Sequence, residues 1–264
     1  MSRLDNKIVL ITGAASGNGE ATTREYLKKT EGKIKLILID INENRLKDLK
    51  NEYLQKYTNL TNDDVYTSYG DLSKSEKIHE FFQKIPKSLI ENLDILINNA
   101  GLARGLEKVG EIDQKDIDLM FSTNILGMIT LTQLIVPIFK KNNKGDIIQL
   151  GSLAAEDPYP GGSAYCATKG AVSTFTTSLR KELINYNIRV SLIEPGIIRT
   201  NFSNTRFNGD ETKVNNVYKD YEPLNADDIA DLIIYITSRR ENCSVSQVVI
   251  LPTHQATMSD KAYR

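Results

Sequence analysis

The sequence has few cysteines and no excess of either charge, and both features exclude classes of protein. Only Cys166 and Cys243 occur among 264 residues. Two cysteines cannot build a disulfide framework, so we expect a reducing compartment. The 33 basic and 34 acidic residues leave a formal net charge of −1. We therefore expect neither a nucleic acid nor an anionic membrane surface as a partner.

The sequence also shows no feature of a membrane or secreted protein. No apolar run approaches the length of a membrane span, and the polar start Met-Ser-Arg-Leu-Asp-Asn-Lys leads directly into the first apolar segment. We therefore expect a cytoplasmic protein with no membrane anchor and no secretory leader. No linker, repeat or low-complexity segment divides the chain, so we expect one domain over residues 1–264.

What the sequence does contain is a series of short apolar runs that alternate with helical patterns. Such runs are typical of strands buried on both faces, and their alternation with helices predicts a parallel sheet covered on both sides. The predicted fold class is α/β, a doubly wound Rossmann-type sheet of about seven strands. The expected strands are residues 8–11, 36–39, 65–69, 93–97, 147–150, 189–193 and 245–251. The first expected helix ends near residue 29. The other expected helices cover residues 42–57, 73–85, 113–140, 163–186 and 225–238.

A glycine-rich turn, Thr12-Gly-Ala-Ala-Ser-Gly-Asn-Gly19, joins the first strand to the first helix. In this context glycines let the backbone approach a pyrophosphate, whose charge meets the helix N-terminus. The spacing is Gly-x-x-x-Gly-x-Gly, which differs from the commoner dinucleotide fingerprint. A tight turn without a ligand is the alternative.

Asp40 ends the second strand, where a carboxylate can accept hydrogen bonds from the ribose hydroxyls of NAD. The same charge would repel the 2′-phosphate of NADP. No basic residue lies in Thr12–Gly19 or at positions 41 and 42, and Arg45 is one helical turn further on. We expect NAD to be preferred by roughly 10²- to 10³-fold, with NADP as the alternative cofactor. A helix-capping role is the other interpretation of Asp40.

The stretch from Ile147 to Gly170 contains three residues that together suggest acid–base chemistry. Ser152 falls at the carboxyl end of a strand, where open α/β sheets place their ligands. Tyr165 and Lys169 are four residues apart, so they share one face of the next helix. A nearby ammonium favours the phenolate and lowers the tyrosine pKa from about 10. By itself a Tyr-x-x-x-Lys pair also arises by chance on solvated helix faces.

Three other segments are candidates for parts of the site. Asn124 lies among apolar residues, so it is either a satisfied core amide or a side chain aimed into the site. Pro195 and Gly196 break the chain after the sixth strand. Residues 201–222 are polar and weakly periodic, and we expect a substrate lid there. Residues 252–264 form a tail without a core pattern.

Taken together and in this order, the glycine turn, Asn98-Asn-Ala-Gly101, Asn124, Ser152, Tyr165-x-x-x-Lys169 and Pro195-Gly196 resemble the short-chain dehydrogenase/reductase family. The resemblance covers nearly the whole chain. Within this family, the sequence more closely resembles the fungal NADP-dependent 3-hydroxy-acid dehydrogenases and their serine-oxidising relatives. This closer likeness is carried by 145–152, 178–185, 216–220 and 226–233.

The resemblance implies that Tyr165 is the acid–base residue, that Lys169 binds the ribose and lowers the Tyr165 pKa, and that Ser152 holds the substrate oxygen. It implies that Asn124 anchors a water in a proton relay. It also implies a homotetramer that pairs the two long helices, and no metal site. The implied substrate contacts are Ser152, Glu156, Tyr165, Arg104 and Phe202. The implied cofactor contacts are Gly13, Ala15, Ser16, Gly17, Asn18, Gly19, Asp40, Asp71, Leu72, Asn98, Ala100, Gly101, Tyr165, Lys169, Pro195, Gly196, Ile198 and Thr200.

The sequence departs from the subgroup at three places. Asp40-Ile41-Asn42 stands where the subgroup has basic residues, and Asn18 replaces an isoleucine. Glu156 stands where the subgroup has an arginine that faces the substrate. A carboxylate there would repel an acid, although Arg104 and Arg199 could offset part of the effect. We therefore expect neutral ketones, diketones or keto esters to react better than free hydroxy acids.

The predicted function is a nicotinamide-dependent oxidoreductase that acts on a secondary alcohol or ketone. An NADP-dependent 3-hydroxy-acid (serine-type) dehydrogenase is the nearest alternative. A sugar-nucleotide epimerase also uses Tyr-x-x-x-Lys, but such enzymes have a larger C-terminal substrate domain. A dinucleotide sensor without catalysis usually lacks the tyrosine or lysine, and both are present here.

Overall fold

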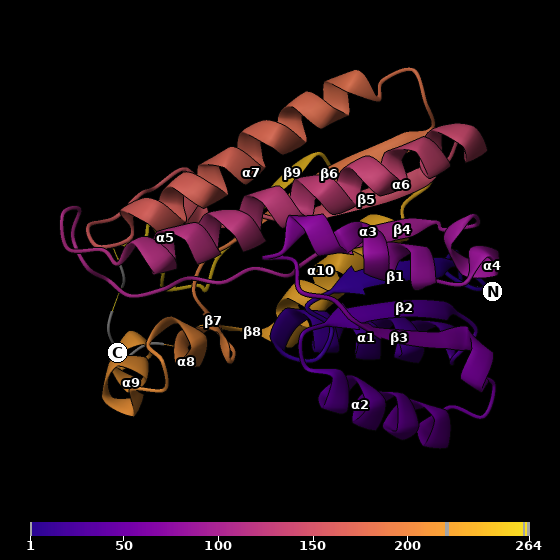
Figure 1. Ribbon diagram of the computed structural model, residues 1–264, viewed down its shortest axis with the longest axis horizontal. Helices are drawn as coiled ribbons and strands as arrows, with labels where there is room; N and C mark the ends of the chain where they lie inside the picture. The colour runs from indigo at the N-terminus through magenta and orange to yellow at the C-terminus, as the bar shows by residue number, and fades with distance from the viewer. Residues whose placement is uncertain (1, 220–221, 261, 263–264) are drawn as a thin grey trace.

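A seven-stranded sheet runs through the middle of the molecule (Figure 1). The computed structural model describes residues 2–219, 222–260 and 262. All neighbouring strands are parallel, in the order β3-β2-β1-β4-β5-β6-β9. This confirms the predicted fold class. The strands are β1 (Ile8–Thr12), β2 (Lys35–Asp40), β3 (Val65–Tyr69), β4 (Ile95–Asn98), β5 (Gly145–Leu150), β6 (Ile188–Pro195) and β9 (Gln247–Ile250).

Helices cover both faces of this sheet because its central strands, such as β1, β2 and β4, are apolar on both sides. In β1, Val9 and Ile11 pack into one core cluster, while Ile8 and Leu10 pack into the other. The first cluster takes side chains from α1 (Gly17–Thr30), α2 (Glu43–Lys56) and α10 (Ala226–Thr237). The second takes them from α3 (Ser75–Lys84), α4 (Lys87–Ile90), α6 (Met128–Asn142) and α7 (Ser163–Glu182). Figure 1 shows α6 and α7 side by side on this second face.

The strand order reverses between β1 and β4. From β1 the chain passes to β2 and β3 on one side, and then returns to place β4 on the other side. The crossovers therefore diverge at this point and leave a crevice beyond the carboxyl ends of the two strands. Thr12 ends β1 and Asn99 follows the end of β4, so both residues lie at the crevice.

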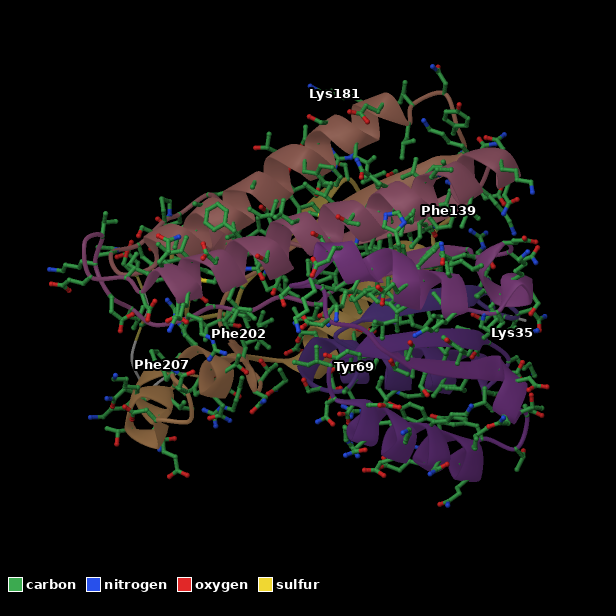
Figure 2. The ribbon with its side chains drawn as sticks, viewed as in Figure 1. Lys35, Tyr69, Phe139, Lys181, Phe202 and Phe207 are labelled. Carbon is green, nitrogen blue, oxygen red and sulfur yellow. The ribbon has the colours of Figure 1, made fainter. Side chains whose placement is uncertain are left out.

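The predicted long helix 113–140 consists of three consecutive segments. These are α5 (Gln114–Phe121), a π-helical stretch η2 (Ser122–Gly127) and α6. By length and composition, Gln114–Asn142 could cross a membrane, with a mean hydropathy of 1.6 in its best window, contrary to our expectation. A core helix passes the same test, and here α6 buries Leu131 and Phe139 completely against the sheet. Figure 2 shows Phe139 beneath this helix.

The predicted lid contains regular structure. Within residues 201–222 lie two short helices, α8 (Phe202–Arg206) and α9 (Glu211–Val217). They follow β7 (Ile198–Arg199), which pairs with β8 (Leu224–Asn225). Residues 220–221 of the lid, and 261 and 263–264 of the predicted tail, lie outside the described residues. Two short 3₁₀ turns, η1 (Asn62–Asp64) and η3 (Leu153–Ala155), complete the elements of the described residues.

Asp94 explains one shifted strand boundary. The fourth strand begins at Ile95, two residues later than predicted. The buried Asp94 carboxylate accepts hydrogen bonds from the Ile8 backbone N–H at 3.0 Å and from the ammonium groups of Lys7 and Lys144. Asp94 therefore joins the start of β1 to the start of β4, and apolar pattern alone does not mark that junction.

Arg189 and Asp146 form a largely buried ion pair between β5 and β6. The side chains of Arg189 and Asp146 are 14% and 15% exposed, and Arg189 Nε lies 2.6 Å from Asp146 Oδ1. Arg189 also donates to the backbone carbonyls of Thr237, Arg239 and Cys243. This guanidinium therefore joins the sheet to the end of α10. Burial raises the pKa of Asp146, although Arg189 opposes that rise.

The substitution Arg189→Met should lower the free energy of unfolding by about 3–5 kcal/mol, because it leaves Asp146 buried without its counter-charge. Urea denaturation followed by circular dichroism measures the change. Adding Asp146→Asn to this variant should recover part of the loss. As a control, Lys47→Met removes an exposed pair with Glu43 and should change stability by less than about 1 kcal/mol. An Arg189→Met variant as stable as the wild type would contradict this account of the fold.

Candidate active site

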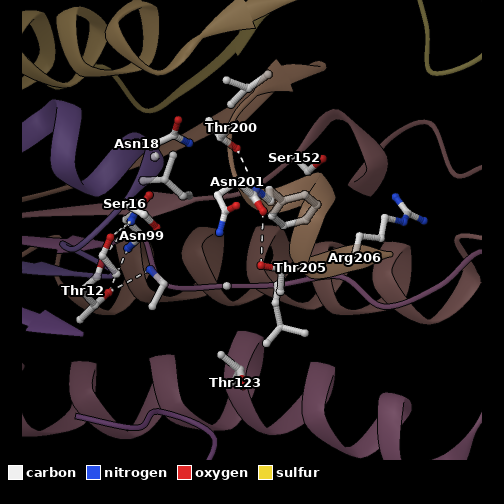
Figure 3. Close-up of a pocket in the computed structure, with 18 of the residues that line it drawn as sticks. Thr12, Ser16, Asn18, Asn99, Thr123, Ser152, Thr200, Asn201, Thr205 and Arg206 are labelled. Atoms are coloured by element: carbon white, nitrogen blue, oxygen red, sulfur yellow. Dashed lines mark hydrogen bonds between the residues drawn. The ribbon is translucent and has the colours of Figure 1, made fainter. Parts of the chain in front are cut away.

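A cavity of about 570 Å³ lies beyond the carboxyl ends of the strands, at the reversal between β1 and β4. Figure 3 shows Thr12, Ser16 and Asn99 at one end of it and Ser152 and Arg206 at the other. Most of the predicted site residues line this cavity. They are Gly13, Ser16, Gly17, Asn18, Asp40, Asp71, Leu72, Ala100, Gly101, Arg104, Ser152, Tyr165, Lys169, Pro195, Gly196, Ile198, Thr200 and Phe202.

The glycine turn forms one wall of the cavity. Gly13 and Gly17 have φ values of 66° and 51°, a left-handed conformation that disfavours side chains. Gly19 does not line the cavity. A Cβ atom there would lie 2.1 Å from the Gly13 carbonyl oxygen, so this glycine allows the start of α1 to pack against the turn. The Asn18 side chain reaches the cavity, and its Oδ1 is buried with no hydrogen-bond partner among the described residues.

Thr12 and Asn99 hold the two strand ends together. Thr12 Oγ1 accepts hydrogen bonds from the backbone N–H groups of Asn99 and Ala100, both at 3.1 Å. The Asn99 amide donates to the carbonyl oxygens of Thr12 and Gly13. Asn99 therefore supports the ends of both strands. Asn98 instead donates to Thr132 in the core, so it does not line the cavity. Thr12 was not among the predicted site residues.

Asp40 is held in a defined orientation at the cavity wall. One carboxylate oxygen accepts from the Ala15 backbone N–H and the other from the Asn42 backbone N–H, each at 2.9 Å. Ala15 therefore contributes through Asp40 and does not itself line the cavity. Asn42 caps α2 by accepting from the N–H of Arg45, so Asp40 is not needed as the cap. The Arg45 guanidinium pairs with Glu20 and Glu52.

Ser152, Tyr165 and Lys169 meet at the other end of the cavity. Ser152 lies two residues after the end of β5 and directly before η3, and Ser152 Oγ accepts a hydrogen bond from the Ala154 N–H at 3.1 Å. Tyr165 and Lys169 are both buried on α7, and the lysine Nζ lies 5.9 Å from the tyrosine ring centroid. Lys169 donates to the Leu150 carbonyl at 2.8 Å, so the end of β5 fixes its ammonium.

Burial sets the protonation of this pair in the polypeptide alone. It raises the pKa of Tyr165, while a hydrogen bond with Ser152 and the Arg206 charge act in the opposite direction. Burial also lowers the pKa of Lys169 to about 8. Desolvation therefore disfavours both charged forms in the polypeptide alone, and the expected lowering of the tyrosine pKa by Lys169 stays a prediction.

Asn124 is buried but does not line the cavity. Its amide accepts from the Leu102 N–H at 2.8 Å and donates to the Leu102 carbonyl and to Thr168 Oγ1. Of the two interpretations offered by the sequence, the side chain fits the satisfied core amide. Asn124 lies in the π-helical stretch η2, and the residue before it, Thr123, lines the cavity. The catalytic role of Asn124 stays a prediction.

Two charged residues expected near the substrate lie elsewhere. Glu156 is exposed and outside the cavity, where it accepts a hydrogen bond from Gln247 on β9. Its predicted contact with the substrate is therefore wrong in this fold. Arg199 is exposed and lies over the Tyr218 ring, 4.9 Å from its centroid, and it does not line the cavity either.

Arg206 and Tyr159 line the cavity near Tyr165, although neither was predicted. The guanidinium carbon of Arg206 lies 5.9 Å from the Tyr165 ring centroid and 5.5 Å from that of Tyr159. A single arginine in a polar segment has no pattern that marks it. The only signal was its position in the predicted lid, four residues after Phe202. Phe202 itself contacts the Tyr165 ring edge-on, and Figure 2 shows where it lies.

Comparisons with known proteins agree with this geometry. The family model for short chain dehydrogenases matches residues 7–211. An NADP-dependent 3-hydroxy acid dehydrogenase of Schizosaccharomyces pombe is 42% identical over 255 residues, which are 97% of this chain and 96% of that protein. A serine 3-dehydrogenase of Agrobacterium fabrum is 33% identical over 97% of this chain and 98% of its own length.

A solved structure gives the same result. The closed form of a serine dehydrogenase complexed with NADP⁺ superposes with a TM-score of 0.88 at 32% identity, and the match covers 97% of this chain and 99% of the other. The family model covers well over half of the sequence, and the relatives match it almost from end to end. The chain belongs to the short-chain dehydrogenase family and is an oxidoreductase.

Proposed function

We propose that this protein is a nicotinamide-dependent dehydrogenase of 3-hydroxy acids or closely related secondary alcohols. The observation that carries the proposal is that Ser152, Tyr165 and Lys169 line one end of a cavity whose other end holds the glycine turn and Asp40. The names of two relatives, a 3-hydroxy acid dehydrogenase and a serine 3-dehydrogenase, support the substrate class.

The cavity suits a dinucleotide in several respects. The glycine turn leaves the backbone bare, and Ser16 precedes α1 without using its side chain as a cap. Asn18 Oδ1 is a buried acceptor that lacks a partner among the described residues. A nicotinamide bound at the end of the cavity that holds Ser152, Tyr165 and Lys169 would supply the acceptor or donor of a hydride. Gly13, Ser16 and Gly17 would hold the phosphates, and Asp40 would hold the adenosine ribose.

The three residues at the other end divide the remaining chemistry. Ser152 Oγ would hold the substrate oxygen, and the Tyr165 hydroxyl would exchange a proton with it. A tyrosine that stays protonated is suited to donate to a developing alkoxide in the reduction direction. The Lys169 ammonium, fixed by the Leu150 carbonyl, would stabilise the phenolate formed in that step.

Two observations favour different cofactors. The relatives with the 3-hydroxy acid name are NADP-dependent, which supports NADP. The fixed carboxylate of Asp40 supports NAD, because a 2′-phosphate beside it would meet a like charge. The next basic residue along the chain after Asp40 is Arg45, and its guanidinium is already paired with two glutamates. We propose NAD as the preferred cofactor, since Asp40 is a property of this chain itself.

The substrate proposal revises the expectation from the sequence. The expected preference for neutral ketones rested on a repulsive Glu156, and that residue lies outside the cavity. Without it, the carboxylates of the described residues that line the cavity are Asp40 and Asp71, whereas Arg104 and Arg206 are also present. This charge pattern supports an acid as the substrate.

We also propose a cytoplasmic homotetramer that pairs the long helices. Phe121 and Leu126 are 38% and 53% exposed on the segment formed by α5, η2 and α6, which supports an apolar contact there. The prediction is a mass of about four chains by light scattering. A Phe121→Glu plus Leu126→Glu variant should dissociate into smaller species, whereas a tetramer unchanged by both substitutions would place the interface elsewhere.

The substitution Tyr165→Phe should reduce kcat by at least about 10²-fold, because it removes the proton carrier and keeps the ring. Steady-state kinetics and a fluorescence titration with NADH separate turnover from cofactor binding, which should change little. Tyr186→Phe, on a tyrosine outside the cavity, is the matched control. Wild-type turnover in Tyr165→Phe would exclude tyrosine as the acid–base residue.

The kcat/KM for NAD should exceed that for NADP by roughly 10²- to 10³-fold at low salt. At an effective dielectric of about 20, like charges about 4 Å apart repel by about 4 kcal/mol, and screening reduces that value. Replacing Asp40 by Ala and Ile41 by Arg should shift the ratio toward NADP. Asp48→Ala, on an exposed residue of α2 outside the cavity, should not. If the wild type prefers NADP, the proposed preference for NAD is wrong and the chain uses the cofactor named for its relatives.

A further inference from the structure

We infer that Arg206 is the residue that recognises the substrate carboxylate and so sets the specificity for acids. This inference deepens the proposed function and rests on it. Arg206 is the last residue of α8, and it lies at the same end of the cavity as Ser152 (Figure 3). Its guanidinium carbon is 5.9 Å from the centroid of the Tyr165 ring, close to where the reacting oxygen would be held.

Two of the three guanidinium nitrogens are fixed by the protein. Nε donates to the Gly105 carbonyl at 2.9 Å, and Nη1 donates to the Tyr159 hydroxyl at 2.8 Å. The rings of Tyr159 and Phe207 lie 5.5 Å and 5.8 Å from the guanidinium carbon. These contacts hold the side chain in one orientation, so little conformational entropy is lost when a ligand binds.

The third nitrogen, Nη2, is buried and has no hydrogen-bond partner among the described residues. A buried N–H of a charged group left without an acceptor is unfavourable. A carboxylate oxygen is a suitable acceptor, since charged hydrogen bonds to arginine are short and strong. Because Arg206 lines the cavity, this unpartnered donor points to an anionic ligand.

Arg206 also has no carboxylate partner among the ion pairs of the described residues. Arg104 approaches Asp116 to 4.0 Å and donates to the Thr205 carbonyl, and Lys169 donates to Leu150. Arg206 and Lys169 are therefore the two cations of the cavity without a carboxylate partner among the described residues, and of these two only Arg206 also has a buried nitrogen without a hydrogen-bond partner there.

The position of Arg206 separates a substrate acid from a cofactor phosphate. Figure 3 shows Ser16 of the glycine turn at the opposite end of the cavity, and Asp40 is hydrogen-bonded to Ala15 of the same turn, so a phosphate of the cofactor would be bound there. Arg206 lies beside Tyr165, and its reach suits a short acid whose carboxylate is a few bonds from the carbon that carries the hydroxyl. Short 3-hydroxy acids meet this condition.

The test compares 3-hydroxybutyrate with its methyl ester, which has the same skeleton and no charge. We expect the wild type to oxidise the acid with the higher kcat/KM. Arg206→Met should lower kcat/KM for the acid by about 10²-fold and change that for the ester by less than about threefold. Arg206→Lys should recover part of the loss. Arg199→Met, on an exposed arginine outside the cavity, should leave both values unchanged.

A binding measurement keeps this inference separate from the proposed function. Malonate, a dicarboxylate without a hydroxyl, should raise the melting temperature of the cofactor-loaded wild type and of Arg199→Met, but not of Arg206→Met. An equal loss for acid and ester in Arg206→Met, or an undiminished malonate effect, would overturn the role of Arg206. If the wild type oxidises neither compound while malonate still acts through Arg206, the role of Arg206 stands and the proposed function fails.

Discussion

The close approach of the backbone at the ends of β1 and β4 is the constraint on which the site depends. Gly19 packs so tightly against the Gly13 carbonyl that a Cβ atom would overlap it, and Asn99 closes the same junction from β4 with two hydrogen bonds. This junction brings the start of α1 up to the strand ends. The cavity, the bare backbone of the turn and the orientation of Asp40 through the Ala15 N–H all follow from it.

The charges of the cavity are separated along its length. Asp40 is hydrogen-bonded to Ala15 of the glycine turn and to Gly70, which precedes Asp71. By contrast, Lys169 and Arg206 lie beside Tyr165, and Arg104 donates to the Thr205 carbonyl next to Arg206. Because the chain is nearly neutral overall, the net charge gave no indication of this separation. Charges interact more strongly in a desolvated site, while burial also lowers the pKa of Lys169 to about 8 and so disfavours its charged form.

Local patterns predicted what local chemistry controls. Most of the strands were recognised because they are short apolar runs, and β3, a strand of mixed polarity, has the predicted bounds. Tyr165 and Lys169 were placed together because helical spacing alone puts positions four apart on one face. Boundaries were less accurate where long-range partners decide them, as at Asp94 and at the π-helical turn that contains Asn124.

The sequence by itself determined the fold class, the glycine turn and the Ser152, Tyr165 and Lys169 set, because these depend on periodicity and on residues close together in the chain. Only the tertiary structure decided that Glu156 turns to Gln247 outside the cavity and that Arg206 lies beside Tyr165. The physical reason is that burial, charge compensation and the direction of a side chain depend on partners up to about a hundred residues away, such as Gly105 for Arg206. No local pattern encodes such partners.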